Sequence, residues 1–172
     1  MNLVLIGYRG TGKSTVAQIL SQKLGMAAVS LDEEIVREAG MPVPEIVEKH
    51  GWTWFRDLES EIAKRFGERS DLILDAGGGV ILRPENTLNL RRDGAVFWLK
   101  ASVEVIVERI HESTARPALT QGKSFLEEVE EVLSERVPLY RAAADREIDT
   151  DRLTPAAVAD EIIREFRTLA AE

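Results

Sequence analysis

The chain has 172 residues and a formal net charge of −8. This length suits a single domain, spanning residues 1–172, and the acidic balance disfavours proteins that coat nucleic acid, because these need a basic face. The absence of cysteine excludes disulfides, thiol catalysis and thiolate metal sites.

The sequence gives no sign of a membrane segment. No stretch approaches the roughly 18 consecutive apolar residues of a membrane span. No basic and apolar leader follows Met1, where a short strand pattern begins at once. We therefore expect a cytoplasmic protein without membrane or nucleic-acid partners, and we expect a monomer.

The first motif follows an apolar strand predicted over Leu3 to Ile6. Gly7 to Ser14 reads Gly-Tyr-Arg-Gly-Thr-Gly-Lys-Ser and has the full G-x-x-x-x-G-K-[ST] pattern of a phosphate loop. Such a loop suits a nucleoside triphosphate and its magnesium. It offers backbone N–H groups, the positive end of the next helix, the Lys13 ammonium and the Ser14 hydroxyl. The alternative is a glycine-rich turn that only links a strand to a helix. The nucleotide-binding residues expected here are Gly10, Thr11, Gly12, Lys13, Ser14 and Thr15.

Hydrophobic periodicity places the next elements. Apolar residues at helical spacing predict a helix that follows the loop and stops at Gly25. Met26 to Leu31 is typical of a strand, with Asp32 at its end opening another helix. A repeat every four residues predicts a helix over Trp52 to Arg65, and Asp71 to Asp75 is a buried strand that ends at three glycines.

The second half continues the alternation. Ala95 to Leu99 is typical of a strand, and a helix with apolar residues from Val103 to Ile110 follows it. Residues 111–124 are polar and lack a clear period, which predicts a mobile lid. A helix over Phe125 to Ala144, a short strand over Arg146 to Thr150 and a last helix capped by Thr154 complete the chain. We therefore expect a three-layer α/β/α sandwich of the phosphate-loop NTPase type, with a mostly parallel sheet of about five strands.

Polar and glycine residues follow the predicted strands. In a doubly wound sheet, ligands gather at the carboxyl ends of the strands, so Asp32, Asp75 and Gly77 to Gly79 should converge beside the phosphate loop. Asp75 has the form of a Walker B carboxylate, which with Ser14 would hold Mg²⁺. The alternative is an aspartate that merely ends a strand. The glycines indicate close approach of another group, such as a substrate, to their backbone, or else a tight turn.

Arginines near these elements are candidate anion ligands. Arg56 lies on the helix that begins at Trp52, Arg116 in the predicted lid and Arg136 late in the next helix. The guanidinium fork suits carboxylate and phosphate, although a single arginine is more often part of a surface ion pair.

Taken together, these motifs resemble shikimate kinase over nearly the whole chain. The phosphate loop is common to many kinases, and the other segments in this order are much more specific. The matching segments are Gly7 to Ser14, Asp32 in Ser-Leu-Asp-Glu-Glu-Ile, Phe55-Arg56-Asp57-Leu58-Glu59, Gly77-Gly78-Gly79, Arg116-Pro117-Ala118-Leu119 and Arg136-Val137-Pro138-Leu139-Tyr140-Arg141.

The resemblance implies ATP-dependent phosphorylation of the shikimate 3-hydroxyl, with Mg²⁺, in aromatic amino acid biosynthesis. Arg56 and Arg136 would hold the shikimate carboxylate, while Asp32 and the backbone of Gly77, Gly78 and Gly79 would contact its hydroxyls. Asp32 is also a candidate general base. Lys13 and Arg116 would neutralise charge on the transferring phosphoryl group. Arg109 resembles an arginine that stacks on adenine, and Arg152 lies close to another nucleotide-side position.

One departure from the family pattern concerns the metal. The family usually carries Asp-x-Asp after the second strand, whereas here the first of these positions is Ser30. Asp75 stands where the family commonly has alanine or serine. We infer that the carboxylate has moved from one strand end to its neighbour.

Two other functions stay open at this point. A related kinase for gluconate or a nucleoside monophosphate would share the fold and the phosphate loop, but should lack the set of Arg56, the triple glycine and Arg136. A noncatalytic nucleotide-binding module is favoured only by the departure at Ser30.

Overall fold

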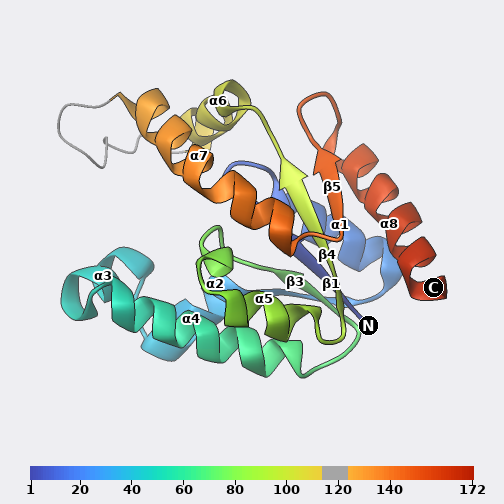
Figure 1. Cartoon of the computed structure of the whole chain (residues 1–172), viewed down its shortest axis with the longest axis horizontal. Helices are drawn as coiled ribbons and strands as arrows, with labels where there is room; N and C mark the ends of the chain where they lie inside the picture. Colours follow the sequence, from blue (N-terminus) through green and yellow to red (C-terminus); the bar gives the residue numbers. More distant parts are fainter. Residues whose placement is uncertain (114–123) are drawn as a thin grey trace.

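The structure, a computed structural model, describes residues 1–113 and 124–172 (Figure 1). In these two ranges the strands form one five-stranded parallel sheet in the order β2-β3-β1-β4-β5. This confirms the expected parallel α/β fold. The strands are β1 (Asn2–Ile6), β2 (Ala27–Ser30), β3 (Leu72–Asp75), β4 (Gly94–Lys100) and β5 (Arg146–Asp149).

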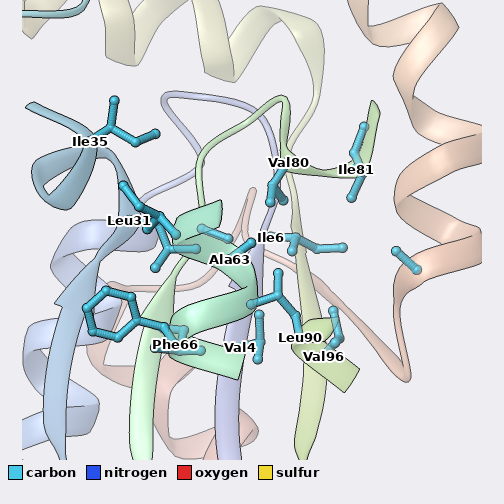
Figure 2. Packing of buried hydrophobic residues seen from close by; sticks show 14 of the residues in the cluster. Val4, Ile6, Leu31, Ile35, Ala63, Phe66, Val80, Ile81, Leu90 and Val96 are labelled. Carbon is cyan, nitrogen blue, oxygen red and sulfur yellow. The ribbon is translucent and has the colours of Figure 1, made fainter. Parts of the chain in front are cut away.

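Helices cover both faces of the sheet, because alternate residues of each buried strand point to opposite sides. Leu3 and Leu5 of β1 pack with α1 and α8 on one face. Val4 and Ile6 pack with α2, α4 and α5 on the other, as Figure 2 shows for Val4, Ile6 and their neighbours. The helices are α1 (Lys13–Leu24), α2 (Leu31–Ala39), α3 (Val43–His50), α4 (Trp52–Gly67), α5 (Pro84–Arg91), α6 (Val103–Ser113), α7 (Phe125–Ala143) and α8 (Pro155–Ala171), with a short 3-10 helix η1 (Val80–Leu82).

Several predicted helix ends are confirmed by their caps. Gly25 ends α1 in the left-handed conformation with φ of 68°, which favours glycine. Thr154 begins α8, and its hydroxyl accepts a hydrogen bond from the Ala157 N–H at 3.2 Å. Neither α3 nor α5 was predicted, since each is only eight residues long, and α5 also has little hydrophobic periodicity.

Two boundaries predicted from the sequence are wrong. Leu31 begins α2 rather than ending β2, because Ser30 caps that helix and its Oγ accepts from the Glu33 N–H at 3.3 Å. The predicted lid starts too early, because α6 continues through residues 111–113 and ends at Ser113. Residues 114–123 of that lid, with Arg116, lie outside the described residues. No helix in the described ranges is long and apolar enough to cross a membrane.

Candidate active site

The phosphate loop joins β1 to α1 at the carboxyl edge of the sheet. Gly7, Gly10 and Gly12 have φ of 146°, 81° and 90°, values that L side chains rarely adopt. A Cβ at Gly7 would lie 2.6 Å from the Leu99 carbonyl oxygen, so β4 crowds the loop there. Thr11 Oγ1 donates to the Tyr8 carbonyl at 2.7 Å. The loop is therefore a tightly folded cradle at the N-terminus of α1, where an anion is favoured.

Lys13 is the buried cation of this cradle. Its Nζ donates to the carbonyl oxygens of Gly7 at 2.7 Å and Tyr8 at 3.1 Å. Burial lowers the pKa of Lys13, and the carboxylates of Asp75 and Asp32 oppose this effect. The Lys13 ammonium is thus within electrostatic range of the Asp75 and Asp32 carboxylates, in agreement with the expected convergence at the sheet edge.

Asp75 ends β3 directly beside the phosphate loop. Its Oδ2 accepts a hydrogen bond from Ser14 Oγ at 2.7 Å, and its side chain is buried. In the sheet register, Asp75 is paired with Ser30 on β2, so the two strand ends are immediate neighbours. Burial raises the pKa of Asp75, while the Lys13 ammonium and the Ser14 hydroxyl lower it.

A cavity of about 300 Å³ lies next to the loop and contains the residues expected to bind the acceptor. Helices α2, α3, α4 and α7, the phosphate loop and the glycine segment after β3 contribute to its walls. Charged residues and glycines are among the residues that line it: Asp32, Arg56, Glu59, Gly78, Gly79 and Arg136. The structure therefore brings both candidate arginines, the aspartate and two of the three glycines to one cavity, whereas Gly77 is not among its lining residues.

Arg56 is held in a defined orientation on α4. Its Nη1 donates to Glu59 Oε1 at 2.8 Å, and Glu59 is buried. Burial raises the pKa of Glu59, and the Arg56 guanidinium opposes this. Residues three apart share a helix face, which is how α4 pairs these side chains.

Two of the three glycines after β3, Gly77 and Gly79, have neighbours that leave no room for a Cβ. A Cβ at Gly77 would lie 2.5 Å from Asp32 Oδ1, whereas one at Gly78 would make only ordinary contacts, 3.5 Å from the Gly7 carbonyl oxygen and 3.6 Å from Arg136 Nη1. At Gly79 the added Cβ would come close to the Arg56 guanidinium, 2.5 Å from its Nη2. At Gly77 and Gly79 the expected close approach is thus made by the site's own charged side chains.

Substitution of Gly79 by alanine should therefore displace Arg56. The hydrogen bond to Glu59 holds the Arg56 guanidinium in place, so the new methyl group must push the guanidinium out of its orientation. We expect the KM for the acceptor that binds in this cavity to rise about tenfold, with the KM for the nucleotide unchanged in steady-state kinetics. Gly40→Ala is the control, since its Cβ would meet nothing within 4 Å and only the backbone is strained. A Gly79→Ala enzyme with an unchanged acceptor KM would show that Gly79 is not needed to keep Arg56 in place.

Arg136 and Tyr140 occupy successive turns of α7. The Arg136 guanidinium carbon lies 5.9 Å from the centre of the Tyr8 ring. Tyr140 is fully buried, and its hydroxyl donates to the Gly78 carbonyl at 2.5 Å. Burial raises the pKa of Tyr140 to about 12, so the hydroxyl stays a donor. Tyr140 thereby ties α7 to the glycine segment.

Asp32 faces the same cavity from the first turn of α2. Its side chain is open to the cleft, yet the surrounding protein limits its hydration and raises the pKa of its carboxyl group. The nearby Lys13 ammonium counteracts this rise. Asp32 is thus placed to accept a hydrogen bond from a hydroxyl in the cavity.

The two arginines expected on the nucleotide side differ in placement. Arg109 Nη1 donates to the Gly10 carbonyl at 3.3 Å, and its Nη2 donates to the Thr150 carbonyl at 3.2 Å. Arg109 therefore connects the phosphate loop to the segment after β5. Arg152 lies two residues beyond Thr150 and is exposed.

The cavity is also lined by Tyr8, Trp52 and Glu128, which were not predicted from the sequence, and by Glu59, which belongs to the matching segment Phe55 to Glu59 but was given no role. Glu59 could have been found from its spacing of three residues from Arg56 on the predicted helix. Tyr8 belongs to a variable position of the phosphate loop motif, and Glu128 to an acidic run typical of a solvated helix face. Neither gives a local signal of a cavity.

Known proteins resemble this chain over almost its full length. The family model described as shikimate kinase matches residues 9–167. A shikimate kinase of Thermodesulfovibrio yellowstonii is 44% identical over 169 residues, which covers 98% of this chain and 96% of that protein.

Solved structures agree with the sequence comparison. Shikimate kinase from Acinetobacter baumannii in complex with shikimate has a TM-score of 0.90 and 32% identity, covering 99% of this chain and 95% of that one. Shikimate kinase from Aquifex aeolicus has a TM-score of 0.82 and 30% identity, covering 99% of each chain. The chain belongs to the shikimate kinase family.

Proposed function

We propose a role for each residue of this site in ATP-dependent shikimate phosphorylation, the activity of the family to which the chain belongs. The γ-phosphoryl group of ATP passes to the 3-hydroxyl of shikimate. The observation that carries the proposal is that Arg56, Arg136, Asp32 and the glycine segment line one cavity beside the phosphate loop. Gluconate and nucleoside monophosphates also carry an anionic group that arginine can bind, so the ADP-release assay described below separates these acceptors from shikimate.

On the acceptor side, Arg56 and Arg136 bind the shikimate carboxylate. Two guanidinium groups on different helices can meet a planar anion from two directions with charge-assisted hydrogen bonds. Asp32 and the backbone of Gly77 to Gly79 contact the ring hydroxyls. Asp32 orients the attacking hydroxyl and takes up its proton, since its carboxylate faces the cavity near Lys13.

On the nucleotide side, the backbone of Gly10 to Ser14 cradles the phosphates, and Thr15 continues this contact in the first turn of α1. Lys13 stabilises the charge that develops on the transferring phosphoryl group. Arg109 and Arg152 contact the nucleoside side. Arg116 supplies a second cation from the segment between α6 and α7.

Mg²⁺ would neutralise phosphate charge when bound with ATP. The available donors suit it, because the Ser14 hydroxyl and the Asp75 carboxylate are hard oxygen ligands 2.7 Å apart. In the described residues no group of three or more His, Cys, Asp or Glu side chains could hold a metal alone. Magnesium keeps several waters and phosphate oxygens, so one carboxylate beside Ser14 suffices. Asp75 therefore takes the place of the family's usual aspartate at the Ser30 position.

Truncation of either carboxylate-binding arginine should weaken acceptor binding. Loss of a charge-assisted partner costs about 1.5 to 3 kcal/mol, so Arg56→Ala or Arg136→Ala should raise the shikimate dissociation constant roughly tenfold or more. Arg56→Lys should not restore full affinity, because an ammonium lacks the planar fork. Titration calorimetry with shikimate measures the effect.

Arg65→Ala is the matched control, because Arg65 lies on the same helix and pairs with Glu38 at the surface. Its shikimate affinity should be unchanged. If Arg56→Ala weakens ATP binding and leaves shikimate binding intact, the acceptor assignment is wrong.

The reaction itself is tested by ADP release under magnesium. Shikimate should accelerate ADP formation, whereas gluconate and nucleoside monophosphates should not. ADP release with another acceptor but not with shikimate would overturn the proposed reaction, and no acceptor-stimulated release would favour a noncatalytic module.

A further inference from the structure

Trp52 is the first residue of α4 and stands at the wall of the acceptor cavity. Its side chain is 57% exposed. A single exposed apolar residue is ordinary on a protein surface, so exposure alone assigns no role. The contacts of this indole are more informative.

The indole lies against the guanidinium that faces the cavity. The Arg56 guanidinium carbon is 5.3 Å from the centre of the Trp52 ring and 5.2 Å from that of Phe55. The two rings meet edge to face, with centres 5.6 Å apart and planes at 84°. This arrangement follows from helical spacing, because residues 52, 55 and 56 share one face of α4.

Arg56 is therefore restrained by two kinds of contact. Glu59 fixes Nη1 through a hydrogen bond of 2.8 Å, and the aromatic rings attract the cation. Phe55 and Glu59 are buried and belong to the wall of the site, whereas the Trp52 contact is made at the exposed rim. An apolar group at that rim also limits water around the guanidinium, which strengthens its hydrogen bonds to an anion.

We propose that Trp52 is a positioning residue for the acceptor, which holds the Arg56 guanidinium toward the cavity and shields its pairing with a carboxylate. This inference rests on the proposed role of Arg56 as a ligand of the shikimate carboxylate. The same helix provides a comparison in Trp54, which is 38% exposed, stacks on His50 with ring centres 4.3 Å apart, and is not among the cavity-lining residues.

The first experiment compares Trp52→Ala, Trp52→Phe and Trp54→Ala in the full chain. Trp52→Ala should raise the shikimate dissociation constant and KM about threefold to fivefold, while the ATP KM stays within twofold. Trp52→Phe keeps an aromatic face and should recover most of the affinity. Trp54→Ala should leave shikimate binding unchanged. Melting temperatures of the three variants check that the fold persists.

A double-mutant cycle with Arg56→Ala tests whether Trp52 affects shikimate binding through Arg56. If Trp52 acts through Arg56, Trp52→Ala should cause no further loss of shikimate affinity in the Arg56→Ala background. An equal loss in both backgrounds would mean that the indole contacts shikimate itself, and would overturn the positioning role.

The cycle also separates this inference from the assignment on which it rests. If Arg56→Ala weakens shikimate binding and Trp52→Ala does not, the role of Trp52 is overturned and that of Arg56 stands. If Arg56→Ala has no effect on shikimate binding, the assignment of Arg56 fails, and the role of Trp52 fails with it.

Discussion

Substitution of Lys13 by methionine should lower kcat by about 10² to 10³, the cost of removing one preorganised charge at a reacting group. Methionine has a similar length but cannot neutralise charge on the transferring phosphoryl group. The fold should persist, because the loop keeps the Thr11 to Tyr8 hydrogen bond and its glycine conformations. Single-turnover kinetics at saturating ATP and shikimate would measure the loss at the chemical step.

Lys13→Arg is the informative second variant. The ammonium is buried and lies 2.7 Å from the Gly7 carbonyl, so the larger guanidinium has no room in the same place. The positive charge alone should therefore restore little activity. A Lys13→Met enzyme that keeps its kcat within threefold would show that the loop lysine is not the phosphoryl-stabilising cation.

Substitution of Asp75 by asparagine should raise the Mg²⁺ concentration needed for half-maximal rate about tenfold and lower kcat. Asparagine keeps the size and can still accept the Ser14 hydrogen bond, but it lacks the charge that a divalent cation prefers. The shikimate dissociation constant should stay within twofold. Asp57→Asn is the control, because that carboxylate is exposed and pairs with Arg83 at 2.8 Å. Magnesium titrations of the rate compare the two variants.

Ser30→Asp should partly rescue Asp75→Asn, because the two positions are paired in neighbouring strands. Ser30 also caps α2. Because aspartate is an equally good N-cap residue, the substitution should leave the N-terminus of this helix intact. An Asp75→Asn enzyme with ordinary magnesium dependence would leave Asp75 as a residue that merely ends a strand.

The sheet and phosphate loop were predictable because their signals are local. Buried parallel strands are short apolar runs, and the loop has a fixed pattern of residues directly after one of them. The convergence of Asp32, Asp75 and the glycines also followed from the rule that strand ends meet at one edge. The start of the lid was wrong because polar residues can complete the last turn of a helix such as α6.

The rest of the site depends on contacts between distant segments. Nothing local to the triple glycine reveals that Asp32 and Arg56 occupy the space a Cβ would need there. In the sequence, Trp52 was only the first residue of the helix predicted over Trp52 to Arg65, and its contact with Arg56 appears once the helix is packed beside the cavity. From the sequence, Ser30 was only the position that lacks the family's usual aspartate. In the structure its side chain caps the N-terminus of α2.

The relocation of the metal carboxylate is the central claim, and a crystal structure with ADP, Mg²⁺ and shikimate bound tests it most directly. We predict that the Asp75 carboxylate contacts Mg²⁺ directly or through a coordinated water, next to Ser14, with the shikimate carboxylate between Arg56 and Arg136. A structure in which Mg²⁺ is bound and Asp75 points away from it, with no bridging water, would contradict this account.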